Sequence, residues 1–207
     1  MNRILSALCF AAFALIALLP TPAAATGFEK LPGEQGKTSP LLMRIVQYQG
    51  STNGAITVEV KNPTGAPQEF SAKGIYFVPT GSANEAPQRL GAVGPFQLQS
   101  SNGPSQRLDR TTIAAGATER LTLDVYCIDS HRASPSSSTS FRIAKDRVPA
   151  PLMKAIDADA TSAAEGYGGV SSPRAKGSVQ SEVWKNRDKK WIPLDGEGKQ
   201  EAAKSQR

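Results

Sequence analysis

Hydrophobic and polar residues alternate along two segments of the chain, Ile56 to Val60 and Glu119 to Asp129. A period of two indicates a strand with one buried face. Shorter apolar runs, bounded by Gly, Pro and Asn turns, predict further strands at 41–48, 69–79 (one strand, or two with a kink at Gly74), 90–99, 111–113 and 141–143. The pattern therefore predicts about six to eight strands.

Strands that recur at short spacing with turns between them are typical of antiparallel sandwiches. We predict an all-β fold, an immunoglobulin-like antiparallel β-sandwich, over residues 41–145. Gly 18 and Pro 15 among 207 residues favour such a turn-rich protein over a helical bundle.

The segments on either side of the predicted sandwich differ in character. Residues 146–193 should form a small, partly helical appendage, with helices near 151–164 and 178–191, where apolar residues recur at helical spacing. Residues 26–40 are rich in Gly, Pro and polar residues, and residues 194–207 are charged and poor in apolar residues. We expect a flexible N-terminal segment and a disordered tail.

Residues 1–25 follow the pattern of a signal peptide. Arg3 precedes an uncharged apolar run from Ile4 to Leu19, and Ala23-Ala24-Ala25 offers a small-residue cleavage site. Removing 25 of the 207 residues leaves a mature chain of 182. No second long apolar run follows, so we expect a secreted or periplasmic protein with no membrane span after leader cleavage.

The positive charge of the chain says little about which molecules it binds. The formal net charge is +6, and it falls to +5 when Arg3 leaves with the signal peptide. Basic residues are densest at 185–190, which we interpret as a solvated face. No nucleic-acid module is present, so we expect no specific nucleic-acid partner; an envelope polymer or a surface protein is the expected partner.

The residues that carry chemistry are few. Cys127 is the one cysteine outside the predicted leader, and His131 is the one histidine. Cys127, Asp129 and His131 alternate along a strand end, but neighbours on one strand do not give a nucleophile and its base the required approach. Cys127 also continues the buried face of its strand, which predicts an inert thiol. We therefore expect that the protein is not an enzyme and that it binds neither a metal ion nor a cofactor.

Two short segments, Tyr126-Cys127-Ile128-Asp129 and Val179-Gln180-Ser181-Glu182-Val183-Trp184, carry a resemblance to a known family. Their order is similar to the thioester domains of bacterial surface adhesins, although Val179 and Glu182 stand where that family has Thr and Ala. With Pro135 between them, they also resemble uncharacterised exported β-sandwich proteins with the same Cys–Pro–Gln–Trp layout, for which no activity is implied.

The adhesin resemblance implies an internal thioester between Cys127 and Gln180 that captures amines. Its pocket would be lined by Tyr126, Asp129, His131 and Trp184. The other interpretation keeps Cys127 as a core thiol, with Gln180 and Trp184 docking the C-terminal tail onto the sandwich. The function that we predict is an exported, non-enzymatic binding or structural module of the cell envelope, and the thioester adhesin is the alternative.

Overall fold

The protein is mostly antiparallel β-structure with little helix, so the all-β class is confirmed. The computed structural model describes residues 27–34, 37–50, 54–81, 86–99, 106–150, 153–154 and 173–189. The predicted signal peptide, the 194–207 tail and most of the first predicted helix lie outside the described residues.

Ten strands are present among the described residues, more than the sequence pattern predicts. They are β1 (Glu29–Pro32), β2 (Thr38–Tyr48), β3 (Ala55–Lys61), β4 (Gln68–Ser71), β5 (Tyr76–Pro79), β6 (Leu90–Leu98), β7 (Gln106–Leu108), β8 (Arg110–Ile113), β9 (Thr118–Cys127) and β10 (Phe141–Ile143). The pattern missed β1 and β7, which are short and carry charged or polar residues. The 26–40 segment, expected to be flexible, therefore holds β1 and the start of β2.

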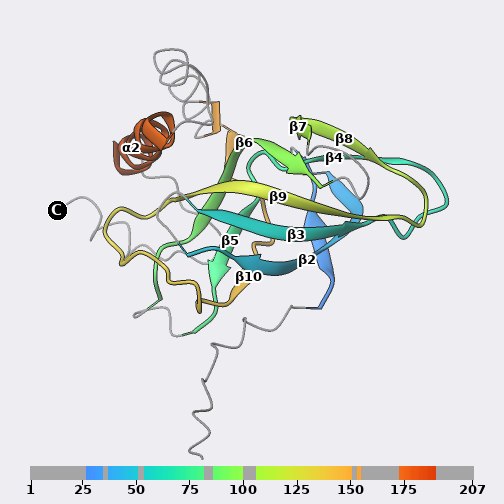
Figure 1. Cartoon of the computed structure of the whole chain (residues 1–207), viewed down its shortest axis with the longest axis horizontal. Coiled ribbons are helices and arrows are strands. Elements are labelled where there is room, and N and C mark those ends of the chain that lie inside the picture. Colours follow the sequence, from blue (N-terminus) through green and yellow to red (C-terminus); the bar gives the residue numbers. More distant parts are fainter. Residues whose placement is uncertain are drawn as a thin grey trace, which may run out of the picture.

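Eight of these strands form one curved sheet, in the order β1-β2-β3-β9-β6-β5-β10, with β7 paired to β6 (Figure 1). Tyr48 of β2 meets Phe141 of β10 edge to face, with ring centroids 5.2 Å apart. This contact joins β10, at one end of the sheet, to β2, the second strand from the other end, so the sheet is nearly closed into a barrel. The strands β4 and β8 form a separate two-stranded sheet.

The core lies inside the curved sheet and follows the alternation of the sequence. The inward residues of β3 (Ile56, Val58 and Val60) and those of β9, from Leu121 to Cys127, are all buried. Phe70 of β4 packs edge to face on Phe96 of β6, at 5.3 Å between centroids, and so joins the small sheet to the large one. The predicted immunoglobulin-like sandwich remains a prediction, since most strands here belong to one continuous sheet.

The C-terminal helix α2 (Pro173–Lys189) packs on the outer face of the large sheet, beside the end of β9 (Figure 1). Its Val179 and Val183 join Tyr126 and Ile128 in a second apolar cluster, separate from the main core. The second helix predicted from the sequence is thus present but begins earlier than residue 178. Among the described residues, no helix is long and apolar enough to span a membrane.

Candidate functional site

Two regions of the molecule carry concentrated polar chemistry: the contact between α2 and β9, and a basic pocket near β1. At the first, the edge of β9 continues past its partner β3. The Val125 N–H donates to the Gly54 carbonyl at 3.0 Å. On each side of an antiparallel strand, hydrogen-bonding positions recur at every second residue. The N–H and C=O of Cys127 therefore point to the same side of β9 as those of Val125.

Gln180 of α2 occupies that next hydrogen-bonding position. The Cys127 N–H donates to Gln180 Oε1 at 2.9 Å, and Gln180 Nε2 donates to the Cys127 carbonyl at 2.8 Å. The carboxamide therefore takes the place of the main-chain N–H and C=O of a residue on a neighbouring strand. The two residues singled out by the sequence do come together, and the contact runs through the main chain of Cys127.

The side chain of Cys127 lies in the main core, with Leu123 and Val125. Burial raises the pKa of the Cys127 thiol to about 12, and the negative charge of Asp129 adds to the shift. The thiol is therefore protonated at neutral pH, which is the unreactive form.

The carboxylate of Asp129 forms a buried ion pair with Arg89. Arg89 donates to it from Nε at 2.9 Å and from Nη2 at 2.6 Å. Burial by itself raises the pKa of Asp129, but the hydrogen bonds and charge of Arg89, with the charge of Arg187, outweigh burial and lower it. Arg187 belongs to α2 and is only 1% exposed, so the helix brings a buried cation to this pair. We call Gln180, Trp184 and Arg187, together with their partners Cys127, Gln88 and Asp129, the helix dock.

The other residues predicted to line a thioester pocket are Trp184, Tyr126 and His131. Trp184 is half-buried, and its Nε1 donates to Gln88 Oε1 at 3.2 Å. Tyr126 packs in the second apolar cluster, where burial above all raises its pKa to about 12. His131 is exposed. Over the part of the chain that the structure describes, no three His, Cys, Asp or Glu side chains are grouped so as to hold a metal ion.

Substitutions at Cys127 test whether its thiol is only a core side chain. Cys127→Ala should lower the free energy of unfolding by about 1 kcal/mol, because it leaves a small cavity. Cys127→Ser should lower it further, because it buries a hydroxyl in an apolar setting. Chemical denaturation measures both values. If the Ser variant were as stable as the wild type, the thiol could not lie in the apolar core.

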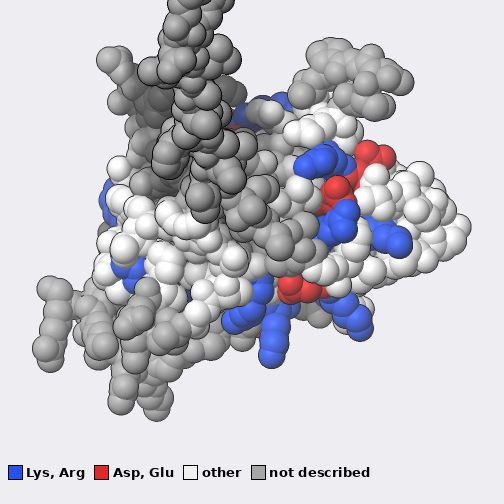
Figure 2. Space-filling view, turned by 60° about the horizontal axis from the view of Figure 1, so that its bottom comes forward, with Lys and Arg blue, Asp and Glu red and all other residues white. Residues whose placement is uncertain are grey.

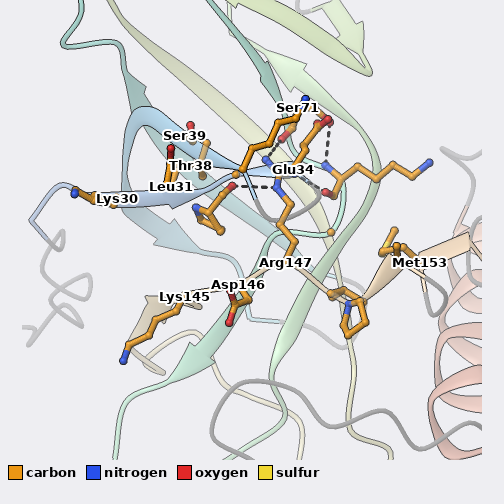
Figure 3. A pocket seen from close by; sticks show the side chains of 18 of the residues that line it. Lys30, Leu31, Glu34, Thr38, Ser39, Ser71, Lys145, Asp146, Arg147 and Met153 are labelled. Carbon is orange, nitrogen blue, oxygen red and sulfur yellow. Dashed lines mark hydrogen bonds between the residues drawn. The ribbon is translucent and has the colours of Figure 1, made fainter.

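The basic pocket is the second region, a cavity of about 880 Å³. Its walls come from β1 and the turn after it, from the turn that follows β4, from the first residue of β8 and from the segment after β10 (Figure 3). Its described charged residues are Lys30, Glu34, Lys37, Lys73, Arg110, Lys145, Asp146, Arg147 and Lys154.

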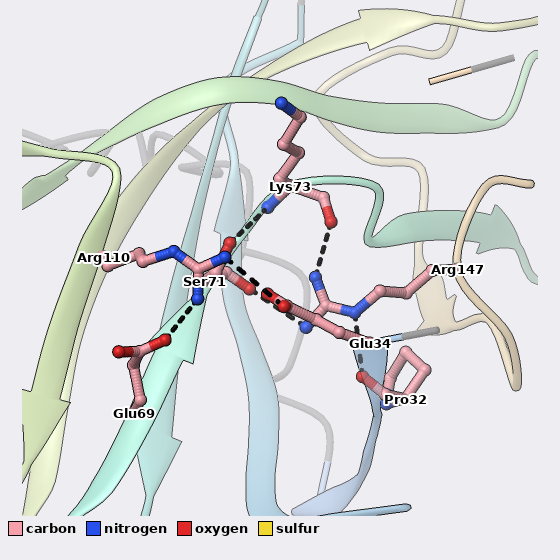
Figure 4. Close-up of polar contacts among 7 residues, drawn as sticks. All are labelled: Pro32, Glu34, Glu69, Ser71, Lys73, Arg110 and Arg147. Carbon is pink, nitrogen blue, oxygen red and sulfur yellow. Dashed lines mark hydrogen bonds and ion pairs between the residues drawn. The ribbon is translucent and has the colours of Figure 1, made fainter. Parts of the chain in front are cut away.

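Arg147 holds the walls of the basic pocket together. Its Nε donates to the Pro32 carbonyl at 3.0 Å, and its two terminal nitrogens donate to the carbonyls of Ser71 at 3.0 Å and Lys73 at 2.5 Å. The side chain thus joins the segment after β10 to β1 and to the end of β4 (Figure 4). Burial lowers the pKa of Arg147. The negative charge of Glu34 opposes this shift, and the positive charge of Arg110 adds to it.

Glu34 lies between the guanidinium groups of Arg147 and Arg110 (Figure 4). Arg110 pairs with Glu34 at 3.4 Å and, more closely, with Glu69. These carboxylates, Glu69 first, raise the pKa of Arg110. An acidic side chain therefore already occupies part of a site in which basic residues predominate.

The lining of the basic pocket concentrates the positive charge of the protein. Its seven basic and two acidic described residues leave a net charge of +5. The remaining 17 basic and 16 acidic residues of the sequence nearly cancel. On the face shown in Figure 2, basic side chains gather in groups with acidic ones beside them. The charge excess of the chain is thus a property of one cavity.

Comparison with protein-family models, curated proteins and solved structures finds no match for this chain. What the two regions do is therefore inferred from their own side chains. The helix dock is buried: Gln180 pairs with the main chain of Cys127, Trp184 with Gln88, and Asp129 with Arg89. The basic pocket is open to solvent along its rim, where Lys30, Lys37 and Lys145 are exposed.

Two glycines shape the turns that line the basic pocket. At Gly33, a Cβ atom would lie 1.7 Å from the Lys37 carbonyl oxygen, so the turn after β1 closes only around a residue without a side chain. Gly74 has φ of 80°, in the left-handed region that favours glycine. It separates β4 from β5, which confirms the predicted kink. Lys37 and Lys73 of the pocket lining lie close to these two glycines in the sequence.

Proposed function

We propose that the protein is an exported, non-enzymatic binding module, secreted or periplasmic, whose basic pocket holds anionic groups of an envelope polymer or surface protein. The observation that carries this proposal is the net charge of +5 on the described lining of one 880 Å³ cavity. A concave site lined by one sign of charge concentrates the field and attracts ligands of the opposite sign. A cavity of this size falls within the range of ligand-binding pockets.

A binding role is also supported by the state of the reactive groups. The side chain of Cys127 lies in the main core, and Cys127 is not among the residues that line the basic pocket. The Asp129 carboxylate is held by Arg89 and cannot serve as a free base. Both groups support the fold rather than chemistry on a substrate.

The immunoglobulin-like sandwich is likewise a proposal for this chain. It is supported by the separate β4–β8 sheet, whose Phe70 packs on Phe96 of the large sheet across the core. Two packed antiparallel layers are the arrangement on which such sandwiches are built.

Binding to dextran sulfate, compared with neutral dextran, tests the proposed function. The wild type should bind dextran sulfate and not dextran. Lys145→Gln should weaken binding about fivefold, since a lysine near an anionic surface contributes about 1 kcal/mol. Glu34→Gln should strengthen binding, because it removes the carboxylate that lies between the two arginines. Isothermal titration calorimetry measures all three affinities.

Lys185→Gln is the matched control for Lys145→Gln. It makes the same change in net charge, and Lys185 is exposed on α2, outside the lining of the basic pocket. It should change the affinity less than twofold. Equal losses in the two variants would show that the ligand senses overall charge and would contradict a site in the pocket.

A thioester adhesin remains the second candidate, favoured by the contact of Gln180 with Cys127. In that reaction the Cys127 sulfur attacks the Gln180 carboxamide carbon, the C–N bond breaks, and ammonia leaves with the thiol proton. The intact mature protein would be lighter than its sequence mass by about 17 Da. We expect intact-mass spectrometry to give, for both the wild type and Cys127→Ala, the mass calculated from the sequence of each mature protein. A deficit confined to the wild type would establish the thioester.

A further inference from the structure

The arginines of the basic pocket are already engaged with the protein. A small anion is held best by a planar arginine fork that offers two parallel N–H groups. Here Arg147 donates from all three of its nitrogens to backbone carbonyls. Arg110 pairs with Glu69 and Glu34. These two arginines therefore shape the described lining more than they present themselves to a ligand.

Four other cations of the lining are lysines on separate parts of the chain. Lys30 lies on β1, Lys37 on the turn that follows, Lys145 after β10, and Lys154 near Met153. All four are exposed. Figure 3 shows Lys30 and Lys145 to one side of Arg147 and Met153 to the other. Each ammonium is a flexible point charge, so a single contact is weak and contacts made together add up.

The shape of the basic pocket favours a flexible chain over a flat surface as its ligand. The charges line a hollow of about 880 Å³, far larger than one phosphate or sulfate group. A flat bilayer can reach the lysines of the rim but not the inner walls of such a hollow, whereas a flexible chain can reach both. The engaged arginines, the dispersed lysines and the concave shape thus all favour an extended, flexible anionic ligand.

We infer that the ligand of the basic pocket is a flexible polyanionic chain, with phosphate, sulfate or carboxylate groups that contact several lysines at once, rather than a single small anion. This inference rests on the proposed function and names its ligand class. It makes the length of the ligand chain, and not the chemistry of one terminal group, the main determinant of affinity.

A series of phosphates of increasing length tests the inference: inorganic phosphate, tripolyphosphate and long-chain polyphosphate, each titrated into the mature protein. The long chain should bind at least about a hundredfold more tightly than inorganic phosphate, as multivalent contact allows. With about four lysines engaged, the logarithm of its association constant should fall with the logarithm of salt concentration with a slope of about −3. Lys37→Gln combined with Lys145→Gln should make that slope less steep by about 1.4, and Lys185→Gln should leave it unchanged.

The outcomes separate this inference from the proposed function. If phosphate and polyphosphate bind equally per molecule, the site reads a single anion, and the inference fails while the function stands. If vesicles of anionic phospholipid bind more tightly than polyphosphate, the partner is a bilayer surface, and the inference also fails. If neither polyphosphate nor dextran sulfate binds, the proposed function itself is wrong.

Discussion

Replacing Asp129 by Ala is expected to lower the free energy of unfolding by about 3–5 kcal/mol, because it leaves buried cations without their counter-charge. Arg89 and Arg187 are 5% and 1% exposed, and both act on the Asp129 carboxylate. Denaturation in guanidinium chloride measures the loss. Asp124→Ala is the matched control: Asp124 lies on β9 and pairs with the partly exposed Arg107 at 2.7 Å, so it should cost about 1 kcal/mol or less.

The same ion pair sets an expected pH dependence. The pKa of Asp129 is lowered in the folded protein, relative to about 3.9 for an unfolded aspartate. Its contribution to stability is therefore complete above the unfolded pKa and is lost as the pH falls through the folded pKa. The wild type should lose this stabilisation below about pH 4, whereas Asp129→Asn should lack it throughout. Identical pH profiles for the two proteins would contradict a stabilising role for the pair.

Gln180→Ala is expected to lower the free energy of unfolding by about 2 kcal/mol and to loosen α2. The substitution removes the hydrogen-bond partners that Gln180 gives to the main-chain N–H and C=O of Cys127, and an unsatisfied buried polar group costs about 1–3 kcal/mol. Chemical denaturation gives the loss of stability. Hydrogen exchange of the α2 amides should become faster than in the wild type, because the helix loses its polar attachment to β9.

Ser181→Ala is the control for Gln180→Ala. Ser181 is the next residue of α2, is exposed, and donates only to the Gly177 carbonyl within the helix. Its replacement should change stability by less than about 0.5 kcal/mol. If the two variants behaved alike, the carboxamide of Gln180 would not be what attaches α2 to the sheet.

The alternation in the sequence predicted the strands that bury one face. The strands β3 and β9 were found with nearly their true bounds, since a half-buried strand must alternate. The strand β1 was missed because Glu29-Lys30-Leu31-Pro32 shows no alternation, and β7 because three residues are too few to show a period. The near closure of the large sheet depends on contacts such as Tyr48 with Phe141, which no local pattern encodes.

The candidate sites were predictable to different degrees. The motif found the residues of the α2–β9 contact. The use of the Cys127 main chain follows from the pairing of β9 with β3, which begins at Ala55 opposite Asp124, and the sequence does not reveal which strands pair. Arg187 lies in a basic stretch that was interpreted as solvated, yet the helix buries it. The basic pocket left no local signal at all. Its lysines lie more than a hundred residues apart between Lys30 and Lys145, and only the fold collects them.

Mapping a bound polyanion onto the protein by NMR tests the central claim most directly. Adding long-chain polyphosphate to the isotopically labelled mature protein should shift the backbone amides of Gly33, Gly74 and Arg147, which line the basic pocket. The amides of Ser181 and Lys185, on the exposed side of α2, should stay unchanged. Shifts confined to α2, or no shifts in the pocket at saturation, would contradict the assignment of the basic pocket as the ligand site.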